Sequence, residues 1–207
     1  MEIKSLEDRR WFLKKVRPKP AKFKFKYIGD FTEKIKLIQD YFHDDMNWLS
    51  HGEDSWIYFT HGQVTTYTIL NVPNFAQIDF PYKAELMVQD KNVLELCKPI
   101  IKELETLYNG KVGMVGFNKL PPGHFMPPHK DQIDGAQPFS PYYKVLRRFH
   151  IPLFTNEQAF IRVSREIKNL KVGECWEFNN NLTHEVWNDG DSDRIHFIID
   201  ILPYRWL

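Results

Sequence analysis

Three residues in the second half of the chain have the types and spacing of a metal site. His129 and Asp131 are separated by one residue, and His184 follows much later in the sequence. On an extended chain, residues i and i+2 point to the same face, so the first two side chains project together. Two histidines and one carboxylate form the facial triad that binds non-haem Fe(II) and leaves coordination positions open. A surface loop is the alternative reading, and Asp134 is a rival ligand whose spacing suits a helix better.

Arg194 follows His184 after a turn that contains Asn188, Asp189 and Gly190. If the two flanking segments form a hairpin, Arg194 lies on the strand next to His184. An arginine there can bind a carboxylate through two parallel hydrogen bonds. A dicarboxylate such as 2-oxoglutarate could then chelate the metal through its 2-oxo acid end and reach Arg194 with its far carboxylate.

A further pair of polar residues lies in the segment KVLRRFHIPLF. Strand alternation places Arg148 and His150 on one face of an otherwise apolar strand. Burying them is costly unless they meet an anion or a polar network, although the solvated face of an edge strand is also compatible with the pattern. His196 shares the face of Arg194, and it either contacts the cosubstrate or substrate or is a hydrogen-bonded core residue.

Three stretches, FNKLPPGHFMPPHKD, RFHIPL and GECWEFNNNLTHEVWNDGDSDRIHFIIDIL, resemble the aspartyl/asparaginyl β-hydroxylase family. The resemblance extends from about Phe117 to Leu202. The family and its relatives, among them free-proline hydroxylases, are Fe(II)/2-oxoglutarate oxygenases with a double-stranded β-helix fold. About ten extra residues, around 134–143, lie between His129 and the pair Arg148 and His150. They form either a lid over the substrate or a longer surface loop.

The resemblance implies a role for each matching residue. His129, Asp131 and His184 would be the catalytic iron ligands, with O₂ as the second substrate. The distal carboxylate of 2-oxoglutarate would bind Arg194, and the 2-oxo acid end would lie near Arg148 and His150. Asn118 would be a further cosubstrate-binding residue, at a position where the family can place a small hydroxyl residue.

These features predict an oxidoreductase, an Fe(II)/2-oxoglutarate-dependent dioxygenase that hydroxylates an amino acid or an amino-acid side chain. A compact chain of 207 residues favours a free amino acid, such as proline, aspartate, asparagine or arginine, over a peptidyl residue. Two alternatives remain open. One is a non-catalytic jelly-roll binding or structural protein, and the other is a cupin-type metalloenzyme that does not use 2-oxoglutarate.

The elements expected to position these residues are mostly strands. Short segments rich in Val, Ile, Phe and Trp alternate with turn residues, which predicts a mainly β jelly-roll or cupin-like double-stranded β-helix with packing helices. Helical spacing follows Asp30 and Glu33, and again from Val93 to Tyr108, where Gly110 is the expected stop. A hairpin is expected around HGQ. The other predicted strands are 112–118, 145–154, 158–164, 174–178, 183–187 and 194–201.

Length and composition fit a single domain over 1–207. Within it we expect a basic N-terminal arm over 1–26, a helical and mixed supporting region over 27–110 and the catalytic β-helix core over 111–207. The arm holds ten Lys or Arg and three Asp or Glu residues, a net charge of +7. We read it as a solvated segment, with no nucleic-acid partner expected. The sequence shows no membrane-spanning run and no secretory signal, and its two cysteines fit a cytoplasmic setting.

Overall fold

The computed structural model describes residues 23–44, 56–58, 64–71, 87–88, 90–131 and 145–204. Most of the basic arm, Asp134 and the expected lid or loop over 134–143 lie outside these residues. The described elements are, in chain order, β1 Phe25–Asp30, α2 Thr32–Asp44, β2 Trp56–Tyr58, β3 Thr65–Asn71, β4 Met87–Val88, α3 Lys91–Tyr108, β5 Gly110–Leu120, β6 Phe125–His129, β7 Arg147–Phe154, β8 Ala159–Val163, β9 Glu166–Lys168, β10 Glu174–Phe178, β11 His184–Asn188 and β12 Arg194–Pro203.

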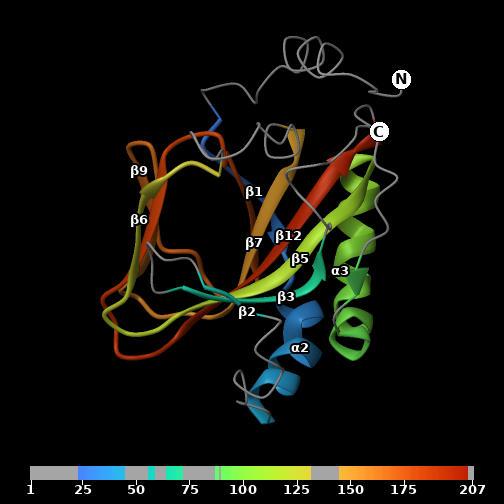
Figure 1. The fold of residues 1–207 in the computed structure, drawn as a ribbon, viewed down its shortest axis with the longest axis horizontal. Helices are drawn as coiled ribbons and strands as arrows, with labels where there is room; N and C mark the ends of the chain where they lie inside the picture. The colour runs from blue at the N-terminus through green and yellow to red at the C-terminus, as the bar shows by residue number, and fades with distance from the viewer. Residues whose placement is uncertain are drawn as a thin grey trace.

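The strands form two antiparallel sheets. The larger, which we call the major sheet, has the order β1-β10-β7-β12-β5-β3-β2, with β4 paired to β3. The smaller, the minor sheet, has the order β6-β11-β8-β9. The minor sheet faces one side of the major sheet, and α2 and α3 cover the other side (Figure 1). The arrangement confirms the predicted mainly β fold with helices on one face.

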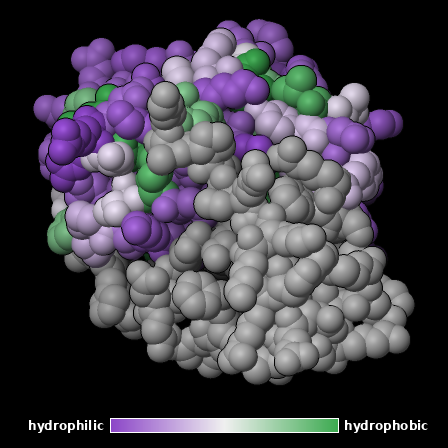
Figure 2. Space-filling model, turned by 90° about the horizontal axis from the view of Figure 1, so that it is seen from above, coloured by the Kyte–Doolittle hydropathy of each residue, from purple (hydrophilic) through white to green (hydrophobic). Residues whose placement is uncertain are grey.

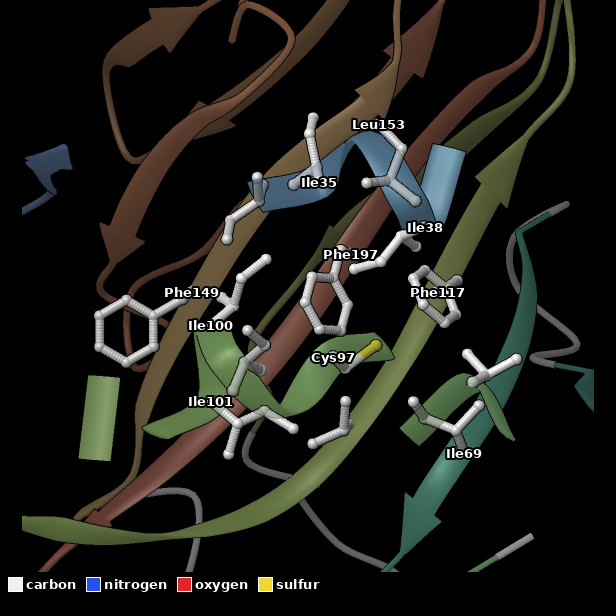
Figure 3. Packing of buried hydrophobic residues seen from close by; sticks show 14 of the residues in the cluster. Ile35, Ile38, Ile69, Cys97, Ile100, Ile101, Phe117, Phe149, Leu153 and Phe197 are labelled. Atoms are coloured by element: carbon white, nitrogen blue, oxygen red, sulfur yellow. The ribbon is translucent and has the colours of Figure 1, made fainter. Parts of the chain in front are cut away.

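The helices cover the major sheet because the buried side of each strand is apolar. Ile35 and Ile38 of α2 and Cys97 and Ile100 of α3 pack over Phe197 at the centre of the sheet (Figure 3). All five side chains are buried. This layer is the main hydrophobic core of the described residues, and it holds the central strands β5, β7 and β12 in place.

The start of α2 and the end of α3 are each marked by a local feature of the chain. The Asp30 carboxylate accepts a hydrogen bond from the backbone N–H of Thr32, the first residue of α2. The stop of α3 is Asn109, with φ of 43°, and the expected stop at Gly110 is wrong. Gly110 begins β5 instead, where a side-chain Cβ would lie 2.5 Å from the Leu202 carbonyl oxygen.

The predicted strands are all present, with small differences in their ends, and β2 pairs with β3 as the HGQ hairpin requires. The hairpin proposed for the segments around His184 and Arg194 is wrong. β11 pairs with β6 and β8 in the minor sheet, whereas β12 pairs with β5 and β7 in the major sheet. Arg194 therefore approaches the site from the opposite sheet.

No helix among the described residues is both long enough and apolar enough to cross a membrane. On the face shown in Figure 2, the described side chains are mainly hydrophilic, with small and separate hydrophobic areas.

Candidate metal centre

The three predicted ligands come together between the two sheets. His129 ends β6 and lies directly opposite His184 at the start of β11, with their ring centroids 4.3 Å apart. Asp131 follows β6, where its backbone N–H donates to the Asn180 carbonyl. One ligand atom from each of the three residues lies within 4.8 Å of the others. The His-x-Asp pair and the distant histidine therefore meet at one point.

Both imidazoles are oriented for metal binding. The Nδ1 atom of His129 lies 2.8 Å from the Pro127 carbonyl oxygen, and that of His184 lies 2.9 Å from the Leu182 carbonyl oxygen. A carbonyl only accepts, so each Nδ1 carries the proton and each Nε2 keeps its lone pair. The Nε2 atoms lie 3.9 Å and 3.4 Å from Asp131 Oδ1. Two imidazole nitrogens and one carboxylate oxygen are a donor set that fits Fe(II).

The electrostatics keep His129 and Asp131 in the protonation states that bind a metal. Burial lowers the pKa of His129, and the neighbouring His184 lowers it further. Burial acts to raise the pKa of Asp131, but Arg148, His184 and His129 outweigh it and hold that pKa below its usual value. At neutral pH the site therefore offers an ionised carboxylate and, at His129, an unprotonated imidazole.

Arg148 contacts the metal-site carboxylate directly. Its Nη1 donates to Asp131 Oδ2 at 2.8 Å, while Nε and Nη2 donate to the two oxygens of Asp200, each at 2.8 Å. Asp200 is completely buried on β12, in register with Arg148 on β7. Sequence reasoning missed the part played by Asp200. The signal was a single acidic residue within the apolar run HFIIDIL, which requires a buried partner.

Arg194 is a buried cation between the two sheets. Its side chain is 2% exposed, and burial lowers its pKa to about 9, so the guanidinium is still charged at neutral pH. No carboxylate of the described residues forms an ion pair with it. Its Nη2 donates to His196 Nδ1 at 3.0 Å, and that atom also lies 3.3 Å from His150 Nδ1. A buried cation is stable only with a compensating charge, so this position calls for an anionic ligand.

The histidine pair connects Arg194 to the metal residues. The His150 ring packs edge-on against Phe178 at 4.8 Å, and Phe178 packs in the same way against His184 at 5.0 Å. Burial holds the pKa of both His150 and His196 well below the usual value, so both are neutral. The expected face-sharing of Arg148 with His150, and of Arg194 with His196, is confirmed by these contacts.

Two buried polar atoms on strands of the major sheet have no hydrogen-bond partner in the described part of the chain. They are Thr66 Oγ1 and His196 Nε2. Thr66 and His196 flank Asn118 in register on β3, β5 and β12, which places Asn118 in the middle of the row. Unpaired buried polar atoms cost free energy, so the row is suited to polar groups of a bound ligand. The buried cation and this row together fit a cosubstrate with a free carboxylate.

The fold is also that of known hydroxylases. A prolyl-4-hydroxylase from Pseudomonas putida is similar with a TM-score of 0.55 and 12% sequence identity, over 88% of this chain and 94% of that one. A viral collagen prolyl hydroxylase from Paramecium Bursaria Chlorella virus-1, solved as a 2-oxoglutarate complex, is similar with the same TM-score and identity, over 88% of this chain and 97% of that one. At such identities the similarity shows the double-stranded β-helix fold. No curated protein matches the sequence.

The sequence comparison is more specific than the fold. The family model described as aspartyl/asparaginyl β-hydroxylase matches residues 65–203, which is 139 of the 207 residues. This confirms the family predicted from the sequence motifs, and with it the enzyme class and the Fe(II) and 2-oxoglutarate cofactor pair, which the donor set between the sheets fits. The chain thus belongs to the aspartyl/asparaginyl β-hydroxylase family of Fe(II)/2-oxoglutarate-dependent oxygenases.

Proposed function

We propose that the chain hydroxylates a free amino acid, with His129, Asp131 and His184 as the iron ligands and Arg194 as the anchor of 2-oxoglutarate. The observation that carries this proposal is a complete donor set together with a buried guanidinium that no carboxylate of the described residues pairs with, in the same inter-sheet region. A barrel that served only as a scaffold would need neither. The metal triad alone would leave the buried charge of Arg194 unexplained.

The chain's own residues supply binding and orientation. His129 and His184 offer Nε2 because their Nδ1 protons are held by backbone carbonyls. Arg194 binds a carboxylate, and His196 accepts a hydrogen bond from it that fixes the guanidinium. When Fe(II) and 2-oxoglutarate are bound they supply O₂ activation, in which one oxygen atom enters a substrate C–H bond and the other leaves in succinate with release of CO₂. Burial of His184 and Arg194, which are 5% and 2% exposed, limits the access of water to the inner part of the site.

The pairing within the major sheet supports the proposal that the described residues belong to one domain. β1 and β3, which precede residue 111, pair with β10 and β5 from the proposed core over 111–207. We propose that the region before residue 111 completes the sheet that carries Arg148 and Arg194. A free amino acid remains our preferred substrate class over a peptidyl residue.

Anaerobic titration of the Fe(II)-loaded protein with 2-oxoglutarate tests the cosubstrate assignment. We expect a visible charge-transfer band to appear, and we expect Arg194→Met to need about 10- to 100-fold more cosubstrate, because hydrogen bonds to a charged group contribute about 1.5–3 kcal/mol. Arg162→Met is the matched control, since Arg162 pairs with Glu185 in the minor sheet. Iron binding without a band would favour a metalloenzyme that uses another substrate. Absence of iron binding would favour a non-catalytic jelly roll.

Succinate release then tests the substrate class. Each candidate amino acid is offered in free form and as the same residue in a peptide blocked at both ends. Turnover of the free form alone supports the proposal. Turnover of the blocked peptides alone would contradict it and identify a peptidyl hydroxylase.

A further inference from the structure

The two oxygens of the Asp131 carboxylate have different surroundings. Oδ1 lies 3.4 Å from His184 Nε2 and 3.9 Å from His129 Nε2, so it faces the point where both imidazoles converge. Oδ2 accepts a hydrogen bond from Arg148 Nη1 at 2.8 Å. Only one oxygen of the carboxylate is therefore presented to the metal position.

Arg148 is itself held in one orientation. Its Nε and Nη2 form a bidentate pair with Asp200, with both bonds at 2.8 Å, which fixes the plane of the guanidinium. Asp200 is completely buried, and β7 and β12 place the two residues directly opposite each other. Because the guanidinium is planar and rigid, fixing one edge also fixes the direction of Nη1.

We propose that Asp200 and Arg148 are positioning residues that restrict Asp131 to binding the metal through a single oxygen. The proposal rests on the proposed function, since it assumes a metal at the triad. Three one-atom ligands leave three positions of an octahedron open, two for a chelating 2-oxo acid and one for O₂. A carboxylate that bound through both oxygens would fill a fourth position. The hydrogen bond from Arg148 to Oδ2, which we call the clamp, therefore keeps a position open for O₂.

This role differs from the one implied for Arg148 by the family resemblance, which places it near the 2-oxo acid end of the cosubstrate. In the present structure the guanidinium is directed to Asp131 and Asp200. The two roles predict different responses to substitution. A clamp acts on the metal alone, before any cosubstrate is added.

The test measures Co(II) binding to the metal-free protein by calorimetry, without 2-oxoglutarate, together with crystal structures of the Co(II)-loaded forms. Arg148→Lys is the main variant, because lysine keeps the positive charge between the two buried carboxylates but cannot bridge them. Arg147→Lys is the matched control. Arg147 is the preceding residue of β7, and it pairs at 3.0 Å with the buried Glu177 instead of with the metal site.

We expect Arg148→Lys to bind Co(II) about 10- to 100-fold more weakly, the usual effect of losing a partner of a metal ligand, and to show both Asp131 oxygens on the metal. Arg147→Lys should match the wild type in both respects. Asp200→Asn provides the second variant, should Arg148→Lys fail to fold, and it should change the affinity and the carboxylate geometry in the same direction.

Three results from the variants would overturn the clamp. The first is wild-type Co(II) affinity with single-oxygen coordination in Arg148→Lys or, where that variant does not fold, in Asp200→Asn. The second is an equal loss of affinity in Arg147→Lys. The third is a defect that appears only when 2-oxoglutarate is added, which would assign Arg148 to the cosubstrate. A wild-type protein that binds Co(II) but not 2-oxoglutarate would contradict the proposed function and leave the clamp standing, whereas no metal binding at all would overturn both.

Discussion

The two faces of strand β12 are both buried but have opposite chemistry. On one face, Ile195, Phe197 and Ile199 pack into the core under the helices. On the other, Arg194 and Asp200 are 2% and 0% exposed and lie between the two sheets. Burial of the apolar face stabilises the fold, whereas burial of the charged face costs free energy unless a partner compensates it. The first face therefore accounts for the stability of the protein, and the second accounts for its chemistry.

Truncating the apolar face should have the largest effect on stability. Phe197 is completely buried and stacks on Phe117, with ring centroids 5.0 Å apart. We expect Phe197→Ala to lower the free energy of unfolding by about 3–5 kcal/mol, measured by urea denaturation, because it removes packing and leaves a cavity. Leu37→Ala is the control, since Leu37 is 65% exposed on α2, and it should change stability by less than about 0.5 kcal/mol. If the folded Phe197→Ala protein also lost its metal affinity, the two faces would not be separable.

Removing a proposed metal ligand should weaken metal binding and leave the stability of the fold largely unchanged. We expect His184→Ala to weaken Co(II) binding by more than about 100-fold, the upper limit for losing a residue that only contacts a metal ligand, because it deletes a donor atom. The metal-free protein should keep its fold. His124→Ala is the matched control. His124 makes the same kind of Nδ1 contact with a carbonyl two residues earlier, at 2.8 Å from Pro122, on the turn before β6. Wild-type affinity in His184→Ala, measured by calorimetry, would remove this residue from the metal site.

Lowering the pH should lower the free energy of unfolding, by less than Phe197→Ala does. His150 and His196 have pKa values held well below the ordinary 6.5 by burial, so the unfolded chain takes up protons near pH 6.5 that the folded protein does not. Stability is therefore full above about pH 6.5 and falls as the pH decreases below it. Each neutral histidine should contribute a loss of about 1.4 kcal/mol between pH 7.5 and 5.5.

The variant His196→Gln isolates one of these contributions. Glutamine cannot be protonated but can still accept a hydrogen bond from Arg194. Urea denaturation of the metal-free variant at pH 7.5 and 5.5 should show a drop about 1.4 kcal/mol smaller than that of the wild type. An unchanged drop would mean that His196 is protonated within the folded protein.

The strand that carries His129 shows a limit of reading the sequence alone. Its segment FMPPH contains two consecutive prolines, which cannot donate hydrogen bonds to a sheet, and no strand was predicted there. The strand β6 exists because it lies at the edge of the minor sheet and pairs only with β11. Asn109 is a similar case. It adopts the left-handed conformation that the sequence pattern assigned to Gly110, because Gly110 is needed where β5 approaches Leu202.

The sequence by itself determined the local part of the site. Alternation along a strand placed Arg148 with His150 and Arg194 with His196, and the spacing of His129 and Asp131 placed both side chains at one point, because these relations depend only on neighbouring residues. The family motifs determined the fold and the enzyme class.

Only the tertiary structure decided which distant residues meet. Arg194 lies in the sheet opposite His184 and not in the expected hairpin. Asp131, Arg148 and Asp200 form one network of ion pairs. The physical reason is that contacts between residues far apart in sequence depend on strand order and register. These are set by the packing of the helices, the register shifts where β12 pairs with β5 and β7, and the pairing of each sheet, and no local pattern encodes them.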